Sequence, residues 1–238
     1  MIRASRPIPL KKIKLVIFDL DGTLVDSQLD LATSVNAMLR HYGRKELPIQ
    51  VIGTYIGDGA PTLIRRALGD PADRKFLQDA LNYFLASYHN HKLDNTCPYE
   101  GIKEALQQIG RGDRKLAVLT NKPVRASQGI LAGLGLADSF FQVYGGNSLE
   151  TKKPDPLGAN TLMREAGATA EETVIVGDSE VDILTARNAG LWSVGVNYGF
   201  APQTLQQVPP DVLVDTPAEL ARALTISSVP EQEELQQK

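Results

Sequence analysis

Four short segments of this sequence carry side chains suited to phosphate chemistry. The first, residues 19–23, reads Asp-Leu-Asp-Gly-Thr, and the others contain Thr120 with Asn121, Lys153, and Asp178 with Asp182. Together they supply carboxylates, a hydroxyl, an ammonium and backbone N–H groups. Mg²⁺ prefers carboxylate oxygens and keeps waters for its substrate, so this set suits Mg²⁺ together with a phosphoryl group.

Each segment by itself also has a plain structural explanation. An Asp-Gly pair after a strand is a common turn, Thr120 and Asn121 could cap a helix, and Lys153 could be a solvated surface lysine. A calcium loop of the EF-hand type that starts at Asp19 is excluded, because its sixth position is Leu24 rather than glycine. The joint occurrence of the four segments is what favours chemistry.

The elements that must position these residues alternate between short apolar runs and helical patterns. The runs that predict buried strands fall at residues 15–18, 116–119, 174–176, 193–196 and 212–214, with a weaker one at 142–144. The helical patterns between them fall at residues 102–109, 123–134, 156–166 and 181–189. This alternation predicts an α/β fold with a Rossmann-like parallel sheet. Ligands bind beyond the carboxyl ends of such strands, so the four segments should converge on one crevice.

Residues 27–90 interrupt this alternation with helical patterns only. Ser27 and Asp30 resemble a capping pair that opens the first helix, and Pro61 and Pro71 open two more. The chain is thus predicted to have a catalytic core, a small all-helical cap inserted into it and a disordered tail. These parts comprise residues 1–24 with 95–226, residues 25–94 and residues 227–238, respectively.

Composition narrows the class of protein. The 238 residues carry 25 basic and 28 acidic side chains, a net charge of −3, which disfavours a nucleic-acid partner. The single cysteine, Cys97, allows no intrachain disulfide and fits a reducing compartment. No signal-peptide pattern and no apolar run of the roughly 18 residues needed to cross a membrane is present. We therefore expect a cytoplasmic monomer or weak homo-oligomer with no membrane partner.

The four segments resemble the motifs of haloacid dehalogenase superfamily phosphatases. That family's Asp-x-Asp-Gly-Thr motif stands at residues 19–23, its second motif at Thr120, its third at Lys153 and its fourth at Asp178 with Asp182. The resemblance runs from about residue 13 to residue 224, and the helical insertion matches the family's small cap after the first motif. Four further segments, residues 56–60, 97–101, 120–123 and 194–199, resemble bacterial phosphoglycolate phosphatases. A small phosphorylated metabolite, 2-phosphoglycolate, is the substrate that this resemblance implies.

Residue chemistry and the resemblance agree on a mechanism. Asp19 is the expected nucleophile, which forms an aspartyl phosphate. Asp21 would protonate the leaving alkoxide and then take a proton from the attacking water. Thr120 and the backbone N–H of Asn121 would bind phosphate oxygens, and Lys153 would neutralise Asp19 and the phosphoryl charge.

The expected cofactor is Mg²⁺. Asp19, the backbone carbonyl of Asp21 and Asp178 would hold it between the nucleophile and the phosphate, two anions that otherwise repel each other. Asp182 follows Asp178 by four residues, on the same helical face, and is expected to contact Mg²⁺-bound waters or Lys153.

The cap is expected to bind the carboxylate of the substrate. Gly57 and Gly59 precede a helix, and backbone N–H groups at a helix start favour an anion. The alternatives are a plain turn between helices, or binding of the carboxylate by Arg65 and Arg66 instead.

Two other functions stay open. One is a phosphatase or phosphomutase for another small phosphorylated metabolite, and the other is a catalytically silent binding protein on the same fold. A dehalogenase is disfavoured, because those enzymes work without metal whereas this chain keeps Asp21 and Asp178.

Overall fold

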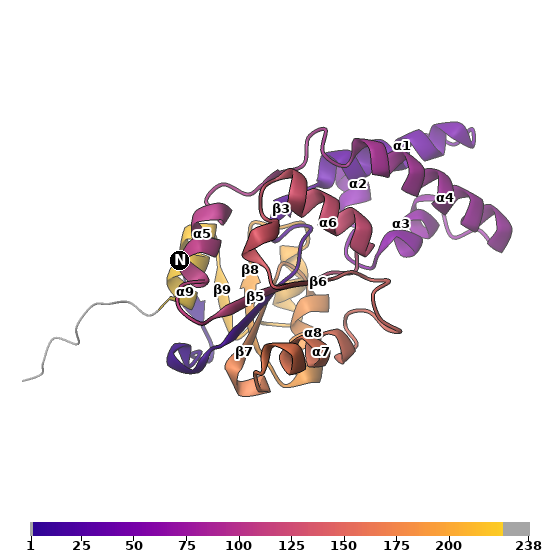
Figure 1. Cartoon of the computed structure of the whole chain (residues 1–238). Helices are drawn as coiled ribbons and strands as arrows, with labels where there is room; N and C mark the ends of the chain where they lie inside the picture. Colours follow the sequence, from indigo (N-terminus) through magenta and orange to yellow (C-terminus); the bar gives the residue numbers. More distant parts are fainter. Residues whose placement is uncertain (1, 226–238) are drawn as a thin grey trace, which may run out of the picture.

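A seven-stranded sheet with helices on both faces forms the larger part of the molecule (Figure 1). The computed structural model describes residues 2–225, so the tail predicted at 227–238 lies outside the described residues. The strands are β1 (Arg3–Ala4), β2 (Leu15–Phe18), β5 (Lys115–Leu119), β6 (Gln142–Tyr144), β7 (Thr173–Gly177), β8 (Trp192–Val196) and β9 (Val212–Val214). Their order across the sheet is β1-β9-β8-β7-β2-β5-β6, and every pair except β1–β9 is parallel. The predicted α/β fold is confirmed.

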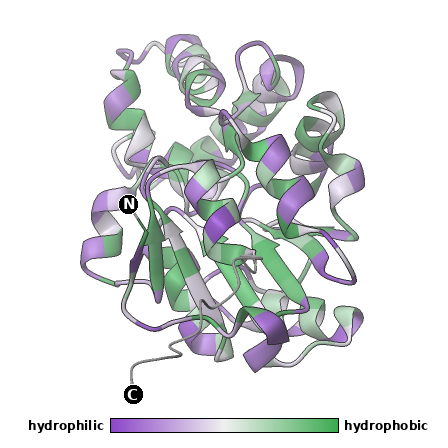
Figure 2. Ribbon diagram, turned by 90° about the vertical axis from the view of Figure 1, so that its left-hand side faces the viewer, coloured by the Kyte–Doolittle hydropathy of each residue, from purple (hydrophilic) through white to green (hydrophobic). Residues whose placement is uncertain are grey.

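The sheet is buried on both faces, which explains why its central strands are continuous apolar runs. Successive side chains of a strand point to opposite faces. Leu15 and Ile17 accordingly join one buried cluster, with residues of the helices at Leu157–Ala166 and Glu180–Ala189. Val16 and Phe18 join another, with residues of the helices at Ile102–Ile109, Val124–Gly133 and Pro217–Leu224. In Figure 2 the strands are mostly green, the colour of hydrophobic residues, between helices that carry both colours.

Four of the five described helices that cover the sheet agree with the helical patterns predicted from the sequence. The five helices are α5 (Ile102–Ile109), α6 (Val124–Gly133), α7 (Leu157–Ala166), α8 (Glu180–Ala189) and α9 (Pro217–Leu224), with short 3-10 turns at Leu10–Lys12, Ala137–Ser139, Ala170–Glu172 and Pro202–Gln206. Gly167 and Gly190 end α7 and α8 in the left-handed conformation, which glycine adopts without steric cost.

A group of four helices lies at the end of the sheet where the strands point (Figure 1). It contains α1 (Gln28–His41), α2 (Ile49–Gly53), α3 (Ala60–Ala67) and α4 (Arg74–His91). Helix α4 packs against α1 and α3, and α2 packs against α1. The five-residue α2 is absent from the sequence prediction, because so short a helix shows no periodicity. We call this group the cap helices. The domain boundaries at 24/25 and 94/95 stay predictions.

The chain enters and leaves the cap helices at one place. Strand β3 (Val25–Asp26) pairs antiparallel with β4 (Cys97–Pro98). Next to this pair, the Asp30 carboxylate accepts hydrogen bonds from the backbone N–H and side chains of Asn95 and Thr96, at 2.7–3.0 Å. Hydrogen bonds therefore connect the two linkers, the segments through which the chain enters and leaves the cap helices.

The predicted capping pair at the start of α1 is wrong. Ser27 stands at the N-cap but makes no capping hydrogen bond, because its Oγ donates to Asp21 Oδ1 at 2.5 Å instead. The Asp30 carboxylate instead accepts hydrogen bonds from Asn95 and Thr96. Tertiary contacts have thus taken over both side chains. Among residues 2–225, no helix is both long enough and apolar enough to span a membrane.

Candidate active site

Sheet order explains why distant motifs meet. Strand β2 lies between β5 and β7, with Phe18 level with both Val118 and Val176. Asp19 follows β2, and the turns after β5 and β7 carry Thr120 and Asp178. The three side chains therefore emerge next to one another at the carboxyl ends of the central strands, and all three line one pocket with Asp21.

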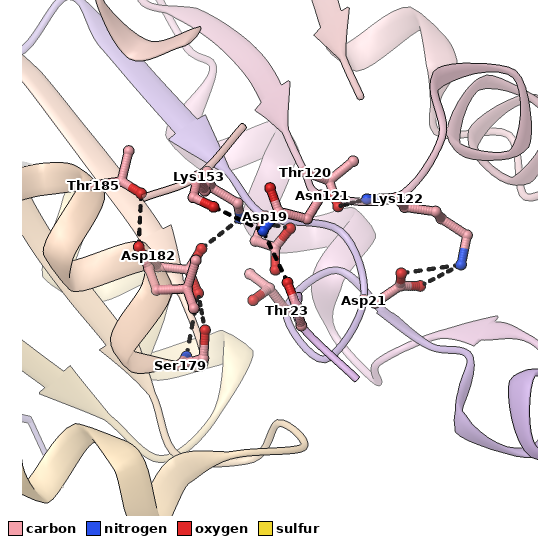
Figure 3. Close-up of polar contacts among 12 residues, drawn as sticks. Asp19, Asp21, Thr23, Thr120, Asn121, Lys122, Lys153, Ser179, Asp182 and Thr185 are labelled. Carbon is pink, nitrogen blue, oxygen red and sulfur yellow. Dashed lines mark hydrogen bonds and ion pairs between the residues drawn. The ribbon is translucent and has the colours of Figure 1, made fainter. Parts of the chain in front are cut away.

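Asp19 lies beside a buried ammonium. Lys153 Nζ is 2.9 Å from Asp19 Oδ1, an ion pair whose geometry falls short of a hydrogen bond, and 2.6 Å from Asp182 Oδ1 (Figure 3). Asp182 Oδ2 accepts hydrogen bonds from the backbone N–H and Oγ of Ser179 at the start of α8. Asp182 thus contacts Lys153 directly, and Lys153 is positioned between two carboxylates.

Backbone N–H groups hold the carboxylate of Asp178 in place. Its Oδ2 accepts hydrogen bonds from the N–H groups of Phe200 and Ala201, at 2.7 and 3.2 Å. Gly22 and Gly199 approach so closely that a Cβ on either would overlap Asp178, and Gly22 adopts φ +80°. These contacts fix the carboxylate, and a side chain at position 22 or 199 would displace it.

Asp21 does not face this cluster with its side chain. Lys122 Nζ contacts its two carboxylate oxygens at 2.9 and 3.0 Å (Figure 3). The Ser27 hydroxyl also donates to Asp21 Oδ1. Lys122 is 6% exposed, and its ammonium lies 4.5 Å from the ring centroid of Tyr88 on α4. Sequence reasoning assigned no role to Lys122 or Tyr88. Two signals pointed to Lys122: it directly follows the Thr120-Asn121 strand end, and it lies in the segment 120–123 that resembles bacterial phosphoglycolate phosphatases.

Asn121 and the cap loop meet across the pocket. Asn121 Nδ2 donates to the carbonyl oxygens of Gly57 and Lys153, at 3.0 and 3.1 Å. Gly57 and Gly59 both line the pocket, and their role in binding a carboxylate stays a prediction.

The two candidate arginines lie elsewhere. Arg65 pairs with Asp70, Arg66 pairs with Asp58, and neither lines the pocket. They are therefore not candidates for a partner of a bound carboxylate in this arrangement.

Comparison with known proteins agrees with this geometry. A family model described as "Haloacid dehalogenase-like hydrolase" matches residues 16–196. The chain belongs to the haloacid dehalogenase-like hydrolases. The resemblance inferred from the four motifs is thereby confirmed, together with the prediction that the chain is an enzyme of that family.

Several relatives of this hydrolase cover nearly the whole chain. A protein of Colwellia psychrerythraea named phosphoglycolate phosphatase is 37% identical over 222 residues, which are 90% of this chain and 98% of the relative. One of the same name from Chromobacterium violaceum is 37% identical over 89% of this chain and 96% of the relative. The crystal structure of a predicted phosphoglycolate phosphatase from Haemophilus somnus superposes with a TM-score of 0.84 at 32% identity, covering 89% of this chain and 97% of that one.

The charge of the hydrolase's site fits a divalent cation. Asp19, Asp178 and Asp182 each offer a carboxylate oxygen within 4.8 Å of the others. Lys153 supplies one buried positive charge, which leaves two negative charges uncompensated when all three carboxylates are ionised. Burial, reinforced by repulsion from Asp182 and Asp19, raises the pKa of Asp178 to about 8. Burial also raises the pKa of Asp19 to about 6, although Lys153 opposes it. A bound cation lowers the free-energy cost of ionising these two buried carboxylates.

We predict that Mg²⁺ stabilises the hydrolase more strongly at high pH than at low pH. The folded pKa of Asp178, about 8, lies above the unfolded value of about 3.9. The stability that protonated Asp178 gives the metal-free protein is therefore fully present below the unfolded pKa of about 3.9. It is lost as the pH rises through the folded pKa of about 8. A cation displaces that proton, so the rise in Tm on adding Mg²⁺ should be at least about 5 °C larger at pH 8.5 than at pH 6.

Thermal melts with Mg²⁺ or with a chelator, at both pH values, measure this difference. The variant Asp178→Asn should abolish it, whereas Asp113→Asn, at an exposed turn, should behave as the wild type does. A Mg²⁺-induced rise in Tm that is the same at both pH values would contradict the prediction.

Proposed function

We propose that this protein is a Mg²⁺-dependent phosphomonoesterase that hydrolyses 2-phosphoglycolate to glycolate and phosphate through an aspartyl phosphate. The observation that carries the proposal is the position of Asp19. This carboxylate stands at the end of the central strand, 8% exposed, next to the ammonium of Lys153 and within 4.8 Å of Asp178. The relatives named phosphoglycolate phosphatase support the choice of substrate.

The first half-reaction forms the enzyme-bound intermediate. An oxygen of Asp19 attacks phosphorus, and the bond between phosphorus and the ester oxygen breaks. Asp21 gives its proton to the departing alkoxide, which leaves as glycolate. Thr120 and the N–H of Asn121 bind phosphate oxygens, and Lys153 balances the charge on Asp19 and the phosphoryl group.

The second half-reaction regenerates Asp19. A water attacks phosphorus, the bond to Asp19 breaks, and Asp21 takes the water's proton as phosphate forms. The carboxylates of Asp19 and Asp178, with the backbone carbonyl of Asp21, would hold Mg²⁺. When bound, this ion screens the repulsion between the carboxylate and the phosphate dianion. Asp182 acts by holding Lys153 in place.

Release of phosphate from two esters of equal chain length tests the proposal. The wild type should hydrolyse 2-phosphoglycolate with a kcat/KM at least about 10-fold above that for ethyl phosphate, which lacks the carboxylate. Chelation should stop turnover, Mg²⁺ should restore it, and Ca²⁺ should substitute badly because its larger, looser shell misplaces the reacting groups. Full activity after exhaustive chelation would contradict the dependence on Mg²⁺. Equal kcat/KM values for both esters would contradict 2-phosphoglycolate as the preferred substrate.

A further inference from the structure

The pocket has one basic side chain on the wall beyond Asp21. Among the described residues that line it, Lys122 is the only lysine or arginine, and the neighbouring cap side chains are apolar. These apolar neighbours are Leu31, Ile56, Leu63, Phe84 and Leu85. An anionic group on a substrate that extends past the phosphate therefore has a single cationic partner within the pocket.

Tyr88 provides an unused donor next to that lysine. Its side chain comes from α4, the residue is 3% exposed, and its hydroxyl has no hydrogen-bond partner in the described part of the chain. A buried polar group without a partner is costly, and a ligand that accepts its hydrogen bond removes the cost. Burial raises the pKa of Tyr88 to about 12, so this hydroxyl keeps the proton that it would donate.

Lys122 has one donor more than its contacts with Asp21 use. An ammonium has three N–H groups, and its two contacts with Asp21 use at most two of them. The Nζ atom lies 4.5 Å from the centroid of the Tyr88 ring, so the ammonium of the core contacts the cap ring that carries the hydroxyl. A carboxylate, with two oxygens, matches a pair of donors.

The contact between Asp21 and Lys122 also sets a length for the ligand. In the proposed reaction Asp21 hydrogen-bonds the ester oxygen of the substrate, and Lys122 Nζ lies only about 3 Å beyond Asp21. In 2-phosphoglycolate the carboxylate carbon is two bonds from that ester oxygen. A carboxylate at this distance reaches Lys122, whereas one attached through a longer chain would pass it.

We propose that the Lys122 ammonium and the Tyr88 hydroxyl form the subsite that binds the carboxylate of a two-carbon phosphorylated acid, an assignment that rests on the proposed phosphatase function. The cap loop is less suited to this role. Gly57 and Asp58 meet the core through carbonyl oxygens, which accept from Asn121 and Lys152 and would repel an anion. Because Lys122 belongs to the core and Tyr88 to the cap, the carboxylate would be bound by both.

Two substitutions test the subsite against the pair of esters introduced above. Tyr88→Phe removes only the hydroxyl, and it should lower kcat/KM for 2-phosphoglycolate about 5- to 15-fold while changing that for ethyl phosphate less than about twofold. Lys122→Met also removes the partner of Asp21 and should slow both reactions. The preference for 2-phosphoglycolate over ethyl phosphate should nevertheless fall at least about 10-fold.

Tyr83→Phe is the matched control. Tyr83 lies on the same helix, but it stacks on His41 at 4.1 Å between ring centroids and does not line the pocket. The control should keep the wild-type preference. The subsite is overturned if both Tyr88→Phe and Lys122→Met also keep it.

A binding measurement separates failure of the subsite from failure of the function. In the Asp19→Asn background with Mg²⁺ present, adding Tyr88→Phe should raise the Kd for 2-phosphoglycolate about 5- to 15-fold. A wild type that hydrolyses neither ester would refute the phosphatase function, and the Kd alone would then decide the subsite, an unchanged value overturning it. A wild type that prefers 2-phosphoglycolate, with variants that share its preference, would refute the subsite alone.

Discussion

Replacing Asp19 by asparagine should lower kcat by about 10⁴-fold or more while leaving the protein folded. An amide cannot form the aspartyl phosphate, so no other group at this position takes over the attack. The metal-free variant should melt at the same temperature as the wild type or above it. This follows because a buried carboxylate close to Asp178 and Asp182 is replaced by a neutral group.

Acid quenching during turnover provides a direct check on the same substitution. Phosphate label from the substrate should remain covalently bound to the wild type and be absent from Asp19→Asn. Asp113→Asn, at an exposed site, controls for the chemistry of the substitution and should retain both turnover and label. A folded Asp19→Asn protein with more than a few per cent of wild-type turnover would remove Asp19 from the role of nucleophile.

Replacing Lys153 by methionine should damage both activity and stability. Its ammonium, 2.9 Å from Asp19 and 2.6 Å from Asp182, is the shared counter-ion of two buried carboxylates. Its removal leaves them unpaired, which should lower the metal-free free energy of unfolding by about 3–5 kcal/mol. For a chain of this length the Tm should fall by about 10 °C. Loss of charge balance at the nucleophile should lower kcat at least about 100-fold.

Adding Mg²⁺ tests whether the loss of stability in Lys153→Met is electrostatic. Adding Mg²⁺ should recover more of the Tm in Lys153→Met than it adds to the wild type, because the cation meets a larger uncompensated charge. Lys103→Met, at an exposed position on α5, should match the wild type in both assays. An unchanged metal-free Tm in Lys153→Met would show that the buried ion pairs contribute nothing to stability.

Three of the residues that the sequence analysis located directly follow strands. Asp19, Thr120 and Asp178 could be placed at one edge because buried parallel strands are visible as apolar runs, and their carboxyl ends meet. The structure brings these residues to one pocket. The local pattern was sufficient here, since each residue's place depends on its own strand and on the parallel order of the sheet.

Lys122 and Tyr88 escaped prediction for a physical reason. Tyr88 belongs to a helical apolar stripe, and that stripe alone indicates core packing rather than a residue that lines a pocket. Its neighbour Lys122 comes from the other part of the chain, and the two meet only when the cap helices dock on the sheet. The false capping pair of Ser27 and Asp30 also gave way to other contacts. Ser27 hydrogen-bonds Asp21 in the preceding turn, and Asp30 accepts from Thr96, 66 residues along the chain.

The pairing of β3 with β4 has a consequence for how this chain can change. Val25 pairs with Pro98 and Asp26 with Cys97, so the two strands form a hairpin whose connecting loop is residues 27–96. The entropy of closing a loop grows only with the logarithm of its length, about 0.6 kcal/mol for each doubling. The sheet therefore tolerates a long insertion at this turn almost as well as a short one. Mutation can rebuild the inserted helices without disturbing the strands that Asp19, Thr120 and Asp178 follow.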